Sequence, residues 1–194
     1  MLGPVLLMLG LSAMPASAAA LLLNAEAVFT AVLAWFAFNE NFDRRVALGM
    51  AALVAGAVAL SWPRDADFTT AWPALCVLAA CLAWAIDNNL TRKVSLADAS
   101  YIVMVKGLVA GATNLALALV AGASLPPPGT VASAAVLGFA SYGVSLVLFV
   151  VGLRNLGAAR TGAHFSVAPF FGALIAITML GAIRSRSNYV LAPE

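Results

Sequence analysis

The sequence predicts an all-helical (all-α) membrane protein, a polytopic bundle of transmembrane helices. Three observations lead to this fold class. Of the 194 residues, 63% are hydrophobic and only 9% are charged, and the mean hydropathy is +1.01. A soluble domain is typically about 45–50% apolar and about 25% charged, and it could not hide this much apolar surface from water. The hydrophobic residues also fall into segments of about 20 residues, the length that crosses a bilayer. Short polar segments separate them.

Seven apolar segments are the candidate helices, and the first of them is short for a full crossing. They are residues 2–14, 17–38, 45–62, 71–90, 99–122, 129–153 and 160–182. One of the connectors holds three consecutive prolines at 126–128, which cannot continue a helix. Because every connector is short, neighbouring helices are expected to run antiparallel.

The first segment has an alternative interpretation as a signal peptide. The Ala-Ser-Ala triplet at 16–18 resembles a cleavage site that follows an apolar core. However, no Lys or Arg precedes Arg44, so the basic start of a signal peptide is missing, and the apolar run simply continues. We therefore interpret residues 2–14 as a membrane helix.

The distribution of Lys and Arg predicts how the bundle is oriented. Loops near 39–45, 91–98 and 154–160 hold six basic residues, whereas the opposite loops, before the tail, hold one, Arg64. Since basic residues collect in cytoplasmic loops, we expect these three loops in the cytoplasm. The expected location is the cell (inner) membrane, which the chain crosses several times.

Other classes of protein and site are disfavoured by composition. The net charge of +2 is small and the basic residues are scattered, so nucleic acid is not an expected partner. Cys76 and Cys81 lie five residues apart and point in different directions on a helix, which suits packing rather than a metal site or a disulfide. No Walker A motif, dinucleotide fingerprint or other cofactor motif is present in the sequence.

A weak internal repeat emerges when the chain is shifted by 142 residues, so that 1–38 aligns with 143–180. The identical pairs are Val5/Val147, Leu6/Leu148, Gly10/Gly152, Leu11/Leu153, Ala16/Ala158, Phe29/Phe171, Ala31/Ala173 and Ala34/Ala176. Helix boundaries and basic loops are in register too. A five-helix unit that is repeated once must be inverted, because five is odd.

The repeat predicts that the chain holds helices three to nine of an expected ten. Residues 1–62 would be the C-terminal part of the first repeat, and residues 71–182 the second repeat without its last helix. Residues 183–194 would be an atypical tail, which resembles the product of a frameshift or a gene end and places Arg184 and Arg186 on the unexpected side.

Several motifs resemble the EamA-type branch of the drug/metabolite transporter superfamily, over about residues 3–181. They are Leu21–Leu33 (LLLNAEAVFTAVL), Phe38-Asn39-Glu40, Arg44-Arg45, Leu48-Gly49-Met50, Ala55-Gly56, Tyr142-Gly143, Arg154, Leu156–Arg160 (LGAAR) and Ala168-Pro169. The resemblance implies secondary transport or export of a small metabolite, with the lipid bilayer and a small-molecule substrate as partners. Two departures stand out: Ala27 replaces a common Pro, and an unrelated tail follows Gly181. The expected protein is a truncated transporter. The alternative is a non-transporting membrane fragment or a pseudogene product.

Ionisable residues inside the predicted spans are the first functional candidates. Such a residue commonly costs about 2.5–3.5 kcal/mol to insert. Glu26 lies near the middle of 17–38, two positions after Asn24, and Lys106 lies within 99–122. Two interpretations stay open: a structural Glu26–Lys106 pair that joins two helices, or a path for substrate or protons.

Further path candidates lie in the second half of the chain. His164 is suited to proton relay by its pKa near neutrality, although a hydrogen-bonded packing histidine is an equal alternative. Ser166 and Pro169 follow on the same segment, and the repeat aligns Ala168 with Glu26. Tyr142 belongs to the Tyr-Gly motif of the resemblance. The complete set of substrate or proton path candidates is Asn24, Glu26, Lys106, Tyr142, His164, Ser166 and Pro169.

Three other polar or small-residue features allow simpler explanations. Asp87, Asn88 and Asn89 lie close to a predicted loop, so solvation at the membrane interface explains them most easily. The motif Gly107-x-x-x-Gly111 permits close packing within the bundle, with a homodimer as the alternative. Ser141 and His164 resemble the dyad of an intramembrane serine protease, but the expected topology separates them along the membrane normal, so we do not expect an enzyme.

Overall fold

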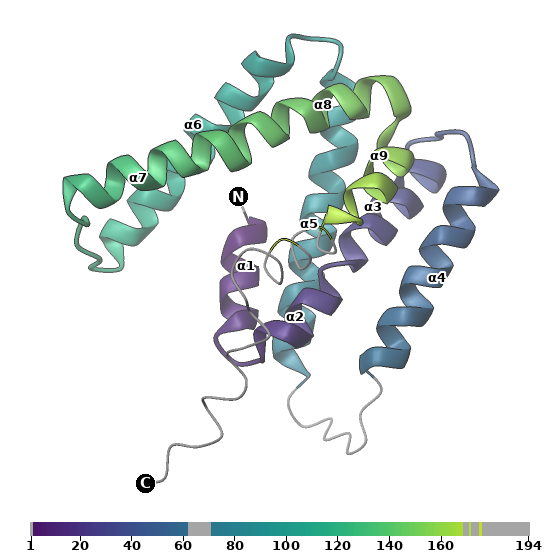
Figure 1. Ribbon diagram of the computed structural model, residues 1–194, viewed down its shortest axis with the longest axis horizontal. Coiled ribbons are helices and arrows are strands. Elements are labelled where there is room, and N and C mark those ends of the chain that lie inside the picture. Colours follow the sequence, from purple (N-terminus) through teal and green to yellow (C-terminus); the bar gives the residue numbers. More distant parts are fainter. Residues whose placement is uncertain (1, 62–70, 169–170, 172–174, 176–194) are drawn as a thin grey trace, which may run out of the picture.

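The computed structural model describes residues 2–61, 71–168, 171 and 175, and every regular element in this part is a helix. The elements are α1 (Leu2–Leu11), α2 (Ala16–Leu22), α3 (Ala25–Phe36), α4 (Arg44–Ser61), α5 (Trp72–Val94), α6 (Ala99–Val120), α7 (Pro128–Gly138), the π-helical turn η2 (Phe139–Gly143), α8 (Val144–Leu156) and α9 (Ala158–Phe165). Figure 1 shows their arrangement. The all-helical fold class is confirmed.

Four of the described helical runs are long and apolar enough to cross a membrane. They are Ala18–Phe36, Trp72–Val94, Ala99–Val120 and Pro128–Leu156. All seven predicted segments contain helix, and α9 is the described beginning of the segment 160–182. Residues 169, 170, 172–174 and 176–182 of that segment, which include Pro169, and the tail 183–194 lie outside the described residues. The division into two inverted repeats stays a prediction.

One boundary differs clearly from the sequence prediction. The predicted span 71–90 continues to Val94, so that Arg92 and Lys93 form part of the last turn of α5. Positive side chains interact favourably with the carbonyl end of a helix. The helix therefore extends beyond its apolar stretch, and the connector to α6 shrinks to residues 95–98.

The second predicted span is broken between α2 and α3 at Asn24. The Asn24 side chain donates to the carbonyls of Leu21 at 3.2 Å and Ala20 at 3.4 Å, a type of bond that bends helices. The Cys81 thiol lies 3.6 Å from the Leu22 carbonyl at the same place. The irregularity is local, since Leu23 and Asn24 keep right-handed helical angles and the Glu26 N–H donates to the Leu23 carbonyl at 3.1 Å. Glu26 lies in the first turn of α3, directly after it.

Helix α5 is the centre of the bundle and packs against both α1 and α3 (Figure 1). Small residues allow the helices to approach closely. A methyl group added at Gly3 would lie 2.5 Å from Nε1 of Trp84, and one at Gly10 would lie 2.6 Å from Cγ2 of Val77. The first helix is thus an integral part of the bundle, as expected from its interpretation as a membrane helix.

Helix α3 also packs against α9. The internal repeat aligns the longer segments that hold them, and within these it aligns α9 with α2. The contact between α3 and α9 belongs to a cluster of mostly small buried side chains: Ala27, Ala31, Ala34, Met50, Leu153, Ala158 and Ala159. A second cluster joins α2 to α5 through Ala19, Val77 and Cys81, and a third joins α6 to α8 through Ala99, Ile102 and Val150.

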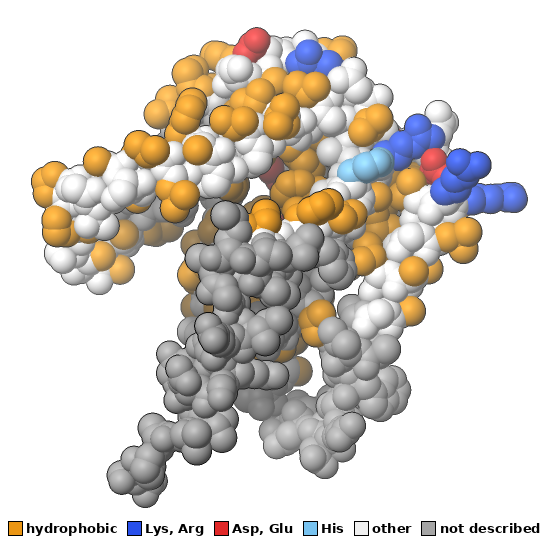
Figure 2. Space-filling model, viewed as in Figure 1, with side chains coloured by type: hydrophobic (Ala, Val, Ile, Leu, Met, Phe, Trp, Pro, Cys, Tyr) orange, Lys and Arg blue, Asp and Glu red, His pale blue; other side chains and the backbone are white. Residues whose placement is uncertain are grey.

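The run from α7 through η2 to α8 is continuous, and it lies beside α6 on one flank of the molecule (Figure 1). We call α6 and α7 the outer flank. Every described side chain from Gly111 to Tyr142 is exposed. Hydrophobic side chains cover much of this flank in Figure 2. Such a surface suits contact with lipid, which is as apolar as the side chains themselves.

Three loops that the basic residues place on one side of the membrane meet at one end of the bundle. We call this end, formed by the α3–α4 loop, the α5–α6 loop and the α8–α9 turn, the tied end. Arg154 donates to the carbonyls of Ser95 and Ala97 and so joins α8 to the α5–α6 loop. Arg160 donates to Asp43 at 3.1 Å and joins α9 to the α3–α4 loop. Lys and Arg side chains lie at this end in Figure 2.

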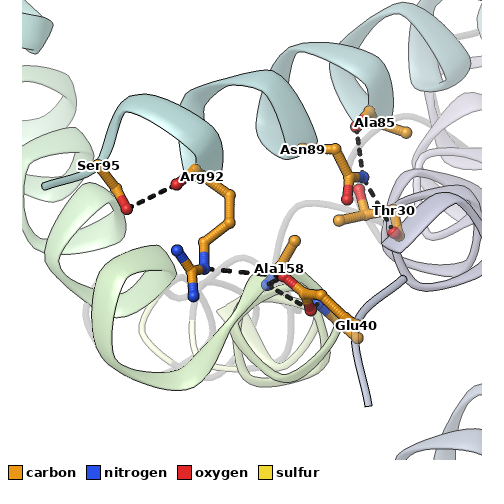
Figure 3. Close-up of polar contacts among 8 residues, drawn as sticks. Thr30, Glu40, Ala85, Asn89, Arg92, Ser95 and Ala158 are labelled. Carbon is orange, nitrogen blue, oxygen red and sulfur yellow. Dashed lines mark hydrogen bonds and ion pairs between the residues drawn. The ribbon is translucent and has the colours of Figure 1, made fainter. Parts of the chain in front are cut away.

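Glu40 makes a third connection at the tied end (Figure 3). Its carboxylate accepts hydrogen bonds from the backbone N–H of Ala158 at 2.9 Å and of Ala159 at 3.3 Å, so it caps the start of α9. Arg92 of α5 lies 3.7 Å from the same carboxylate. One acidic side chain therefore holds three helical elements together.

Candidate functional site

A cavity of about 810 Å³ lies between α5 and the outer flank and reaches α1, α3 and α8. Aromatic side chains, Trp84, Phe149 and Phe165 among them, line part of its wall. The polar side chains that line it are Glu26, Asp87, Asn88, Lys106, Asn114, Tyr142 and Ser145. A mainly apolar hollow with a few polar groups is typical of small-molecule sites.

Glu26 is held by Asn88 rather than by a positive charge. The Asn88 side-chain amide donates to Oε1 of Glu26 at 2.9 Å and lies 3.3 Å from the Thr30 hydroxyl. Asn88 and Thr30 are buried, whereas Glu26 is partly exposed to the cavity. The arrangement fixes the acidic group at the wall and leaves it without a charged partner among the described ion pairs.

Lys106 has its partners on α5. Its ammonium group donates to Oδ2 of Asp87 at 2.6 Å and to the Thr91 hydroxyl at 2.7 Å. Asp87 and Thr91 are four residues apart and therefore lie on the same face of the helix. The interpretation of a Glu26–Lys106 pair is wrong, because Lys106 forms its ion pair with Asp87 of α5 and Glu26 of α3 bonds to Asn88 instead.

The expectation that Asn88 and Asn89 are solvated at the interface is also wrong. Both are buried within the bundle, because α5 continues past them as a packed helix. The Asn89 amide donates to the carbonyl of Ala85 at 2.9 Å and to that of Thr30 at 3.1 Å (Figure 3). Asp87 is the exception, with a side chain that is 49% exposed and lines the cavity.

The structure brings three of the seven predicted path residues, Glu26, Lys106 and Tyr142, to the cavity. Asn24 bonds to its own helix at the break. His164 is exposed and its Nδ1 lies 2.8 Å from the Arg160 carbonyl, while Ser166 is buried and donates to the Ala163 carbonyl. Neither His164 nor Ser166 lines the cavity.

Tyr142 reaches the cavity from the π-helical turn between α7 and α8. Such turns widen a helix locally and occur frequently at functional sites. The neighbouring Ser141 donates to the Leu137 carbonyl at 2.6 Å. Because Ser141 and His164 each bond to their own helix, the geometry supports no nucleophilic dyad.

The GxxxG motif of α6 does not pack against another helix in the described part. No described atom lies within 4 Å of a methyl group added at Gly107 or Gly111. The expectation of close packing within the bundle is wrong there, because α6 packs mainly against α8 through its first turns, at Ala99 and Ile102. Instead, Gly107 lines the cavity.

Sequence reasoning missed four polar residues of the cavity: Asp87, Asn88, Asn114 and Ser145. Helical spacing could have found Asn114, since it follows Lys106 by eight residues and therefore lies on the same face of α6. The pairing of Asp87 with Lys106 depends on how α5 and α6 meet, which no spacing reveals. The described residues hold no group of three or more His, Cys, Asp or Glu side chains that could bind a metal ion.

Comparisons with known proteins agree with an all-helical membrane protein. The sequence model of the EamA-like transporter family matches residues 1–62 and 71–192. An uncharacterized transporter of Methanothermobacter thermautotrophicus is 30% identical over 187 residues, which are 92% of this chain and 54% of that protein. The chain thus spans about half the length of the curated relative it matches. No solved structure gives a significant match. The chain belongs to the EamA-like transporter family, whose members are membrane transporters and not enzymes.

Proposed function

We propose that this protein carries a small metabolite across the cell membrane by secondary transport, and that the solute binds in the cavity between α5 and the outer flank. The observation that carries the proposal is the cavity itself. It lies among apolar helices long enough to cross a bilayer, and it contains the Glu26–Asn88 contact and the Lys106–Asp87 pair. Ionisable groups within membrane spans are costly and commonly serve transport.

The two polar contacts give the cavity different chemical properties on its two sides. Glu26 has one amide donor, so its carboxylate can still accept hydrogen bonds or a proton from a solute. Lys106 already donates to Asp87 and Thr91. A solute with both hydrogen-bonding and apolar groups would therefore match the polar residues and the aromatic wall together. The broken helix beside Glu26 resembles the discontinuous helices that form binding sites in transporters.

The orientation that we propose places the tied end in the cytoplasm of the cell. Six basic residues in the loops of this end support it, together with the general preference of such loops for the cytoplasmic side. Lipid and a transported solute are the partners that the proposal requires. A homodimer stays a hypothesis.

Uptake into vesicles tests the transport proposal. The chain would be reconstituted in phosphatidylethanolamine–phosphatidylglycerol vesicles and supplied with radiolabelled amino acids and nucleosides and with cationic dyes. We expect uptake of at least one compound above that of empty vesicles. Glu26→Gln and Lys106→Met should each reduce it by about tenfold or more, as expected from the loss of a hydrogen bond to a charged group.

The matched control for these variants is Asn155→Ala. The Asn155 side chain is exposed and bonds to the Val151 carbonyl of its own helix, so its loss should leave uptake unchanged. Correct insertion without uptake of any compound would contradict transport by this chain. Uptake that persists in both cavity variants would show that the solute binds outside this cavity.

Cysteine labelling tests the orientation independently of transport. Single cysteines at Arg44, Asp98 and Ser124 would be treated in sealed cells with a membrane-impermeant maleimide. We expect reaction at Ser124 alone, since the other two positions lie at the tied end. Labelling at Arg44 or Asp98 would show that the tied end lies outside the cytoplasm and would contradict the proposed orientation.

A further inference from the structure

Helix α6 contains two glycines whose presence packing does not explain. A glycine in the interior of a helix is less favourable than alanine because it gives the unfolded chain more freedom. At Gly3 and Gly10 the reason for glycine is a neighbouring helix, which a side chain would strike. At Gly107 and Gly111 no described atom lies within 4 Å of an added methyl group.

Gly107 differs from Gly111 in one respect, because it lines the cavity and Gly111 does not. A side chain at Gly107 would therefore extend into cavity space rather than into another helix. The wall that α6 contributes has polar side chains at Lys106 and Asn114, and Gly107, Val109 and Ala110 lie between them in sequence. Lys106 and Asn114 are about 12 Å apart along the helix axis.

We propose that Gly107 is a size-determining residue of the cavity. Its missing side chain leaves room beside the Lys106–Asp87 pair for a bulky apolar group, such as an aromatic ring. The aromatic residues Trp84, Phe149 and Phe165 line the same cavity and suit such a group. The inference rests on the proposed function, and it specifies the solute class as molecules that join a polar group to a bulky apolar one.

Mixed-disulfide formation at a cysteine in the cavity measures this size limit without any knowledge of the solute. A methanethiosulfonate transfers its thioalkyl group to the thiolate and releases methanesulfinate. Ser145 lines the cavity and is exposed, so Ser145→Cys in a background with Cys76→Ala and Cys81→Ala supplies the reporter. The protein would be held in phosphatidylethanolamine–phosphatidylglycerol vesicles. Two reagents of the same chemistry would be compared, methyl methanethiosulfonate and benzyl methanethiosulfonate.

We expect Gly107→Leu to slow the reaction with the benzyl reagent by about tenfold or more, because added methylene groups must share space with the ring. The reaction with the methyl reagent should keep its rate. Gly107→Ala should give an intermediate effect. Gly111→Leu is the matched control, since it lies on the same helix in equally open surroundings, and both reagents should then react as in the parent.

Several results would overturn the inference. These are an unchanged benzyl rate in Gly107→Leu, an equal loss of both rates, and the same slowing in Gly111→Leu. A circular dichroism spectrum and a monodisperse elution profile for each variant would show that it is folded. Because this disulfide formation does not require transport, a size-selective effect in a chain that takes up no solute would support the size limit and contradict the proposed function.

Discussion

The tied end and the outer flank hold their helices in opposite ways. At the tied end, Glu40, Arg154 and Arg160 each bond to a segment more than 50 residues away in sequence. On the outer flank, one side chain of α6, Lys106, makes the described polar contacts to α5, and nearly all later side chains of α6 and α7 are exposed.

The difference indicates which variants should affect stability and which should affect the cavity. Contacts between membrane helices gain little from the hydrophobic effect, so packing and polar bonds decide how firmly two helices are joined. The tied end has both, whereas the flank beside the cavity has few. We therefore expect variants at the tied end to affect stability, and variants at the flank to affect binding and cavity shape.

The largest expected effect comes from Gly157→Ala at the tied end. Gly157 has φ +85° and ψ 170°, a conformation that is essentially restricted to glycine. An added methyl carbon would lie 2.8 Å from Oε2 of Glu40 and would displace it. We expect a loss of about 3 kcal/mol in unfolding free energy, measured by reversible denaturation in detergent. Gly111→Ala is the control and should be neutral or slightly stabilising. Equal stability of the two variants would contradict the prediction.

Glu40→Ala should have the next largest effect. It removes the cap of α9 and leaves Arg92 without its carboxylate, and hydrogen bonds to charged groups are worth about 1.5–3 kcal/mol. Glu40→Gln retains an acceptor oxygen and should lose less, by the same denaturation measurement. If Gly157→Ala acts by displacing Glu40, it should cost less in the Glu40→Ala background than in the parent. If Gly157→Ala costs the same unfolding free energy in both backgrounds, it does not act through Glu40.

The Lys106–Asp87 pair on the flank should be weaker. Its side chains are 30% and 49% exposed, so solvent screens the pair, and exposed pairs typically contribute about 0.2–1 kcal/mol. A double-mutant cycle with Lys106→Met and Asp87→Asn should give a coupling in this range. A coupling free energy as large as the loss measured for Glu40→Ala would show that polar contacts on the outer flank are as strong as those at the tied end.

The smallest expected effect is a pH dependence at the edge of the tied end. The backbone N–H of Arg45, and then the guanidinium of Arg160, lower the pKa of Asp43 below its ordinary value of 3.8. The unfolded chain therefore binds a proton more readily, so the contribution of Asp43 is present above this value and is lost as pH falls through the lower, folded pKa. Asp43→Asn should flatten the stability curve below about pH 4. An unchanged curve would show that the contact is not maintained in solution.

Features that depend on neighbouring residues in the chain were predictable from the sequence. The apolar segments, the polar connectors and the family follow from composition and local motifs, because a membrane helix must satisfy its backbone within one continuous segment. The basic loops were grouped on one side, and the structure joins them at one end through Glu40, Arg154 and Arg160. Glu26, Lys106 and Tyr142 were found as unusual residues in their segments, and all three line the cavity.

The partners of these residues were decided by the tertiary structure alone. Glu26 bonds to Asn88 from 62 positions away, and Glu40 caps a helix that begins 118 positions later. Burial of Asn88 and Asn89 depends on how far α5 continues and on where α3 crosses it. The sequence by itself thus determined which segments form apolar helices and which ionisable residues stand within them, since both are local properties. Which group neutralises another depends on distances of a few ångströms between helices, and these exist only once the bundle has packed.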